Sequence, residues 1–208
     1  MVKQGAASTR ERLIDATLTL VAERGFDGVS VGDIEEGAGL APRSGALYKY
    51  FPSKLAVLEA GVERHLAAVA EVELDLVELP LGDPPTEIAA VSRWLLAELD
   101  AQRTITHVIE REGDRLPELR DRMREGISDR GYRIAVSLIE RWAGTTDAAI
   151  DREALGVLMV GALINFRRST WTFGAAPLGL DDERMIEVFV ALSTALTDAD
   201  ADADGRRR

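Results

Sequence analysis

The chain has 208 residues and a formal net charge of −11, with 46% hydrophobic and 29% charged residues. This composition is typical of a soluble globular protein that can bury a substantial core. The absence of cysteine excludes disulfides, thiolate nucleophiles and cysteine-based zinc sites. No apolar run approaches the roughly 18 residues of a membrane span, and MVKQGAASTRERL lacks the apolar core of a signal peptide, so we expect a cytoplasmic protein.

Apolar residues recur at helical spacing along almost the whole chain, and period-two alternation is rare. The first helix is predicted to begin at Ser8-Thr9-Arg10-Glu11, which has capping-box spacing, and to end at Gly25. A second helix is predicted to start at Ser30–Asp33, a third near Pro42 and a long fourth after Pro52-Ser53. Further helices are predicted at about 85–102, 103–112, 118–143, 151–173 and 181–197. The sequence therefore predicts an all-α protein with an N-terminal three-helix helix-turn-helix head and a C-terminal bundle of about five to six helices.

One segment of this acidic chain carries no carboxylate. Residues 37–58 contain no Asp or Glu but include Arg43, Lys49 and Lys54. A negative protein repels nucleic acid overall, whereas a local face of cations gains by displacing counterions from phosphates. Because a helix-turn-helix inserts its last helix into the major groove, this segment favours DNA contact. The alternative is a chance run whose aromatic side chains pack in the core, which we favour for Phe51 and leave open for Tyr50.

Residues 9–60 resemble the TetR family of transcriptional regulators. The resemblance rests on RERLIDATLTLVAERGFDGVSVGDIEEGAGL followed by GALYKYFPSKLAVLEA, above all on Leu47-Tyr48-x-Tyr50-Phe51-Pro52-Ser53-Lys54. By resemblance, Tyr48, Lys49 and Lys54 would hold phosphates, while the start of the third helix would face base edges. The residues assigned to DNA are Ser30, Arg43, Ser44, Gly45, Ala46, Tyr48, Lys49, Tyr50 and Lys54.

One departure from the family pattern affects this assignment. The residues LAPRS separate Gly39 from Gly45, about two residues more than is common in the family. The turn or the first part of the third helix must absorb them, so the bases read by Arg43 and Ser44 stay open.

TetR-like proteins act as dimers, which suits a symmetric operator. We expect the dimer surface on the last two helices, because ALGVLMVGALINF at 154–166 is apolar around most of its circumference. Gly156, Gly161 and Ala162 would permit close helix approach. The last helix carries a stripe of Met185, Ile186, Phe189, Leu192 and Leu196. A single monomeric core that uses both helices is the alternative.

The family usually places a ligand pocket among its middle helices, and pockets are mostly apolar with a few polar anchors. The candidates are Trp94, His107, Glu110, Tyr132, Trp142, Asn165, Phe166 and Trp171. Each of them, taken alone, is more often a packed or solvated residue than a ligand contact. The sequence does not name a ligand.

The resemblance divides the chain into a DNA-binding domain at 1–53 and a ligand-binding and dimerisation domain at 54–197. The charged end at 198–208 is expected to be a disordered tail. The expected function is that of a dimeric repressor that a small-molecule effector releases from a palindromic double-stranded operator. We expect no catalytic residue, metal, cofactor or membrane partner: neither His65 nor His107 completes a Glu-x-x-His motif, and no Gly-x-Gly-x-x-Gly loop occurs. The alternatives are an all-α enzyme, for which nothing marks a triad, and a helical protein-interaction module without DNA binding. The operator, the target genes, the effector and the choice between repression and activation stay open.

Overall fold

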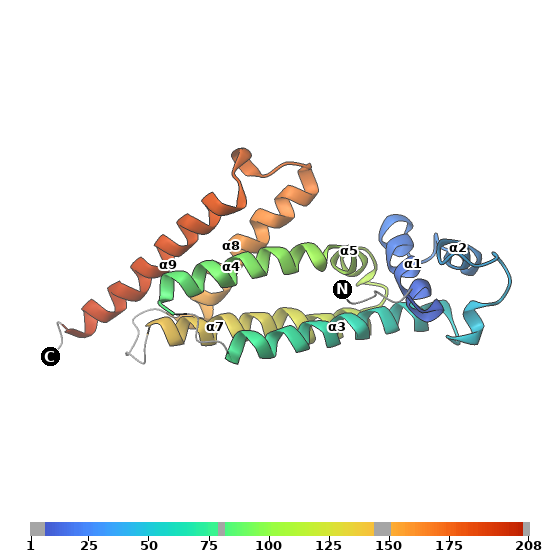
Figure 1. The fold of residues 1–208 in the computed structure, drawn as a ribbon, viewed down its shortest axis with the longest axis horizontal. Helices are drawn as coiled ribbons and strands as arrows, with labels where there is room; N and C mark the ends of the chain where they lie inside the picture. Colours follow the sequence, from blue (N-terminus) through green and yellow to red (C-terminus); the bar gives the residue numbers. More distant parts are fainter. Residues whose placement is uncertain (1–6, 79–81, 144–150, 206–208) are drawn as a thin grey trace, which may run out of the picture. The chain divides into compact units, whose positions relative to one another are not determined.

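The computed structural model describes residues 7–78, 82–143 and 151–205, and the side chains of 7–70, 82–142 and 151–195. Across these residues the chain is helical and contains no strand, which confirms the all-α prediction (Figure 1). The elements in chain order are α1 (Thr9–Arg24), α2 (Val31–Gly37), η1 (Leu47–Lys49), α3 (Lys54–Glu78), α4 (Pro84–Ala101), α5 (Arg103–Glu112), α6 (Pro117–Met123), η2 (Arg124–Ser128), α7 (Asp129–Ala143), α8 (Arg152–Phe173), η3 (Pro177–Gly179) and α9 (Asp182–Gly205). Among the described residues, none of these helices combines the length and apolar character needed to cross a membrane.

The first two helices begin where the capping residues predict. Ser8 accepts a hydrogen bond from the Glu11 amide at 3.2 Å, and Gly25, at φ 80°, ends α1. At the start of α2, the Asp33 amide donates to the Ser30 hydroxyl at 3.2 Å, and the Ser30 amide donates to the Asp33 carboxylate at 2.7 Å. These bonds satisfy N–H groups that a helix leaves unpaired in its first turn, so local sequence alone fixes both starts.

Two later segments differ from the prediction. The helix expected at 118–143 is interrupted by the π-helical turn η2, where Gly126 lies so close to Leu66 that a Cβ would come within 2.6 Å of it. The last helix, predicted to end at about residue 197, continues as α9 to Gly205. No Pro or Gly between Asp182 and Gly205 stops the helix, and alanine is the strongest helix former.

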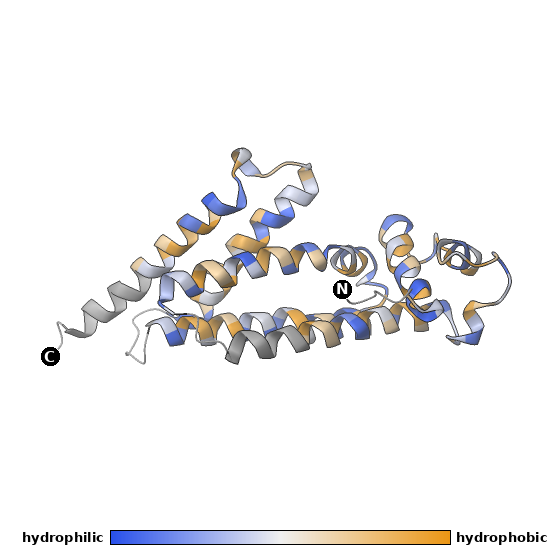
Figure 2. Cartoon of the chain, in the orientation of Figure 1, coloured by the Kyte–Doolittle hydropathy of each residue, from blue (hydrophilic) through white to orange (hydrophobic). Residues whose placement is uncertain are grey.

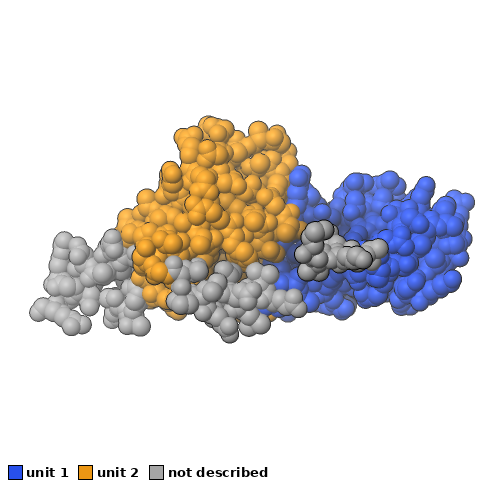
Figure 3. All heavy atoms as spheres, viewed as in Figure 1, with its two compact units in different colours: residues 1–73, 102–127 blue, residues 74–101, 128–208 orange. Residues whose placement is uncertain are grey.

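The chain divides into two compact units (Figure 3). The first contains residues 1–73 and 102–127, and the second contains residues 74–101 and 128–208. In the first unit, buried side chains of the head share one core with those of α3, α5 and α6, as Leu13, Leu47, Val62 and Val108 show. The packed unit therefore extends well beyond residue 53, where we expect the DNA-binding function to end.

The second unit is built from α4, α7, α8 and α9. Its core includes Leu96, Leu163, Phe166 and Ile186. Gly156 of α8 lies against α7, where an added Cβ would come within 2.9 Å of Val136. This glycine thus permits close packing of two helices within one chain.

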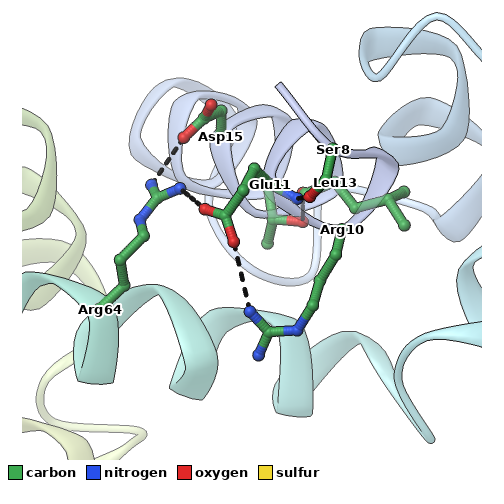
Figure 4. Close-up of polar contacts among 7 residues, drawn as sticks. Ser8, Arg10, Glu11, Leu13, Asp15 and Arg64 are labelled. Carbon is green, nitrogen blue, oxygen red and sulfur yellow. Dashed lines mark hydrogen bonds and ion pairs between the residues drawn. The ribbon is translucent and has the colours of Figure 1, made fainter. Parts of the chain in front are cut away.

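Arg64 of α3 links to α1 in the first unit (Figure 4). Its guanidinium contacts the carboxylates of Glu11 and Asp15, each at 2.6 Å, with all three side chains partly exposed. The hydrogen bond from Arg64 lowers the pKa of Glu11 below its ordinary value of 4.5. A carboxyl group with a lowered pKa in the folded protein stabilises the fold at pH values above its ordinary pKa. This contribution is lost as the pH falls through the pKa of the folded protein.

We therefore expect Arg64→Ala to lower the free energy of unfolding by less than about 1 kcal/mol at pH 7, because partly exposed ion pairs are screened. The difference between variant and wild type should shrink as the pH falls below about 4. Urea titrations of both proteins at several pH values measure this difference in the free energy of unfolding. A difference that stays constant down to acidic pH would contradict the assigned pair.

Candidate DNA-binding site

The segment between α2 and η1 is not the helix that Pro42 predicts. Arg43 has φ 60° and Gly45 has φ 71°, and helical structure resumes only in the single turn η1. Two left-handed residues so close together cannot continue a right-handed helix. The prediction of a third helix from Pro42 is therefore wrong, and the residues that lengthen this segment form a loop.

A buried carboxylate holds this loop. Glu35 of α2 has no exposed surface, and its oxygens accept from the amides of Ser44 at 2.9 Å and Leu47 at 3.1 Å. The sequence reasoning missed Glu35, although a signal exists. Val31, Ile34, Glu35 and Ala38 occupy one helical face, so a carboxylate stands at a core-facing position.

Six of the residues predicted to contact DNA are exposed: Ser30 before α2, and Arg43, Ser44, Tyr48, Lys49 and Tyr50 in this segment. Tyr48 is the most exposed of the tyrosines in this segment, at 60%. The aliphatic stem of Arg43 lies over Gly32, where an added Cβ would come within 3.1 Å of the Arg43 Cγ. The segment thus presents two cations and two phenols to solvent.

Ser30 and Phe51 have structural contacts. The Ser30 hydroxyl donates to Asp33 at 2.6 Å, and the bonds from Ser30 lower the pKa of the Asp33 carboxyl. Phe51 is buried, with the Arg10 guanidinium 5.0 Å from its ring centroid. The interpretation of Phe51 as a core residue is confirmed.

Lys54 is partly buried and bound within the protein. Its ammonium donates to the carbonyls of Phe26 and Val29, at 2.7 Å in the second case, and lies 4.1 Å from the Phe26 ring centroid. An ammonium has three donors, so these contacts leave one for another acceptor. The structural role of Lys54 was not predicted, because its partners lie 28 and 25 residues away.

The family model of bacterial regulatory proteins, tetR family, matches residues 13–60. Over 75 residues the chain is 33% identical to the HTH-type transcriptional repressor KstR of Mycolicibacterium smegmatis, covering 36% of this chain and 35% of that protein. Over 82 residues it is 32% identical to the HTH-type transcriptional regulator AcrR of Shigella flexneri, covering 39% of this chain and 37% of that protein. The head of this chain, at residues 13–60, is of the TetR family. The match nevertheless spans only about a third of the length of these curated relatives.

The TetR-family fold extends beyond the matched segment. A TetR-like transcriptional regulator from Rhodococcus sp. RHA1 superposes with a TM-score of 0.67, covering 92% of this chain and 96% of its own. The sequence identity is 18%, so this likeness shows the fold. The resemblance seen at residues 9–60 is confirmed.

The second unit contains a cavity of about 730 Å³, open space at its mouth included. It is lined by Ile88, Val91, Ser92, Leu95, Ala135, Leu138, Ile139, Trp142, Arg152, Leu155, Met159, Val160, Leu163, Phe189 and Ser193. Polar atoms come from the two serines, from Arg152 and from the Trp142 indole. The wall is otherwise apolar.

Of the eight residues predicted for a pocket, only Trp142 lines this cavity. His107 and Glu110 lie in the first unit, on an exposed face of α5, where Nδ1 and Oε2 are 3.5 Å apart. Phe166 is buried in the core of the second unit. Helical spacing predicts which face of a helix such a residue occupies, but not whether that face borders a cavity.

The other four candidates also lie outside the cavity wall. The Trp171 indole donates to Asp100 at 2.9 Å. Trp94 and Tyr132 are partly buried, and Asn165 is exposed.

Glu87 fixes the orientation of the Trp142 indole. This buried carboxylate accepts from the Trp142 Nε1 at 2.7 Å and from Arg141 at 2.8 Å. Its partners lie more than fifty residues along the chain, and no local pattern marks such a contact.

Hydrophobic residues occur along α8 and α9 (Figure 2), and several of their side chains are exposed in the single chain. Leu158 is 70% exposed and Val188 is 66% exposed, with Val157 and Leu192 also largely exposed. On α9 the stripe named from the sequence divides between two faces. Ile186 is buried, Met185 and Phe189 pack against the core, and Leu192 faces solvent; the side chain of Leu196 lies outside the described residues.

Proposed function

We propose that this protein is a ligand-responsive DNA-binding regulator of transcription, acting as a dimeric repressor in the cytoplasm. The observation that carries the proposal is the exposed Arg43, Tyr48 and Lys49 in a TetR-type head whose loop is free of outward carboxylates. A net charge of −11 opposes contact with DNA elsewhere on the surface, so this face would direct the encounter.

In this proposal two heads occupy successive major grooves, roughly 34–36 Å apart. Tyr48 and Lys49 contact phosphates, and the third ammonium donor of Lys54 reaches another. Arg43 is the side chain best suited to read a base, because its guanidinium matches the O6 and N7 acceptors of guanine. Ser44, Gly45 and Ala46 lie beside it, with Ser30 and Tyr50 at the edges of the same surface.

The cavity of the second unit would hold the effector. Its lining favours a largely apolar small molecule with one or two hydrogen-bonding groups, which Ser92, Ser193 or Arg152 can meet. Such a ligand weakens DNA binding only by its differential affinity for the two states of the protein. Two relatives of this chain are named a transcriptional repressor and a transcriptional regulator, which supports repression as the proposed mode.

The double variant Tyr48→Ala, Lys49→Ala tests the proposed DNA face. Duplexes that bind the wild type are first selected from a random library, and binding is then measured by fluorescence anisotropy at several salt concentrations. We expect the variant to bind at least about tenfold more weakly, since a phosphate contact and a polar aromatic contact are lost together, with a salt slope lower by about one. Circular dichroism should show unchanged helix content, because both side chains are exposed. Unchanged affinity in the folded variant would refute this face.

A further inference from the structure

Glu35 is a carboxylate without exposed surface in the head of a DNA-binding protein. Burying such a group costs free energy unless hydrogen bonds compensate. Each of its oxygens accepts one backbone amide from the loop, Oε2 from Ser44 and Oε1 from Leu47. The same loop contains every residue to which we assign a base contact.

The hydrogen bonds of these two amides determine whether the segment can form a helix. In a helix that began near Pro42, the Leu47 amide would donate to the carbonyl of Arg43, four residues earlier. Glu35 takes that donor instead, and the Ala46 amide donates to the Ser44 hydroxyl at 3.3 Å. Side chains therefore satisfy the amides of Ser44, Ala46 and Leu47, and the backbone at Arg43 stays left-handed.

We propose that Glu35 is a positioning residue for sequence reading, because its carboxylate holds the loop in the shape that presents Arg43 and Ser44 to base edges. This inference rests on the proposed function and deepens it. Glu35 touches no DNA itself and acts through the backbone of the loop. Phosphate contacts by Lys49 depend on it less, because Lys49 lies within η1, whose own hydrogen bonds persist.

The isosteric change Glu35→Gln leaves one acceptor oxygen where two amides need one each, so one amide loses its partner. An unpaired buried donor destabilises the loop conformation that binds DNA. We therefore expect binding to the selected duplex to weaken about tenfold. Affinity for a scrambled duplex of the same length should stay within about twofold, because phosphate contacts dominate there. Glu36→Gln is the matched control, since this neighbouring glutamate is exposed.

The direction of the change in DNA affinity distinguishes a positioning role of Glu35 from an effect of its charge. Both glutamine variants remove one negative charge near DNA, which by electrostatics alone strengthens binding. We expect Glu36→Gln to bind the selected duplex as well as the wild type or slightly better, and only Glu35→Gln to bind more weakly. Equal behaviour of the two variants would overturn the inference while leaving the proposed function intact. If the wild type selected no duplex, both would fall.

Hydrogen exchange provides a measurement that does not depend on a variant that folds. In the wild type, free and bound to the selected duplex, the Ser44 and Leu47 amides should exchange more slowly than the Gly45 amide, for which the described residues offer no acceptor. The Ser44 amide distinguishes the loop from a helix that begins near Pro42. In such a helix this amide would lie in the first turn and would have no backbone acceptor. Fast exchange at Ser44 in the complex would show that the loop refolds on DNA and would overturn the role of Glu35.

Discussion

A Leu158→Arg protein is expected to be monomeric and to bind the selected duplex at least about a hundredfold more weakly than the wild type. Leu158 is 70% exposed on α8, and Val188 on the neighbouring α9 is 66% exposed. Exposed apolar residues on the last two helices indicate an interaction surface. In a twofold dimer the same surface meets itself, so one substitution places two arginines in one interface. Joining two heads raises the effective concentration of the second by factors of about 10² to 10⁴, and a monomer loses that gain.

Light scattering after size exclusion gives the mass, and anisotropy with the selected duplex gives the affinity. Leu178→Arg is the matched control, because Leu178 is 97% exposed but lies on η3, outside the two helices. It should leave mass and affinity unchanged. A Leu158→Arg protein that remains dimeric would place the interface elsewhere. A monomer that kept full affinity would show that dimerisation is not needed for DNA binding.

The elements of this fold follow from local sequence to an unusual extent. Ser8, Ser30 and Gly25 mark helix ends through bonds to residues three or four positions away, and such bonds need no tertiary information. The helices at 103–112 and 151–173 likewise agree with the structure within one residue. The all-α class and the family resemblance both rest on signals of this kind.

The loop before η1 could not be predicted in the same way. Pro42 is compatible with a first helical turn, and propensity alone favours a helix there. The outcome depends on Glu35, which lies nine residues before Ser44 and twelve before Leu47 and captures both amides. A tertiary hydrogen bond thus overrides a local preference at the segment that we propose for base reading.

The cavity was predictable only as a type of site. The sequence indicates apolar middle helices with a few polar residues, but periodicity does not tell which side chains meet. Trp142 lines the cavity and its indole donates to Glu87, whereas His107 and Glu110 pair on the surface of the other unit. Pocket residues come from four helices that are distant in sequence, so their assembly follows from packing.

Substitutions of Lys54 and Lys49 are expected to affect different properties: the first lowers stability, and the second changes DNA binding. Lys54→Met keeps the aliphatic stem but removes the ammonium that binds the Phe26 and Val29 carbonyls. Hydrogen bonds from a charged group contribute about 1.5–3 kcal/mol each, and a cation over an aromatic ring adds about 0.5–1 kcal/mol. We expect a loss at the lower end of these contributions together, about 3.5 kcal/mol, because Lys54 is only partly buried. This loss lowers the melting temperature by about 7–14 °C in a protein of this size.

Lys49→Met is the matched control, because it removes the same charge from an exposed side chain. It should leave the melting temperature within about 1 °C, since surface substitutions rarely change stability by more than about 0.5 kcal/mol. Its salt slope on the selected duplex should fall by about one. Scanning calorimetry and anisotropy of both variants measure the two effects. An unchanged melting temperature in Lys54→Met would show that the carbonyls of Phe26 and Val29 do not depend on its ammonium, and Lys54 would then act chiefly at the DNA.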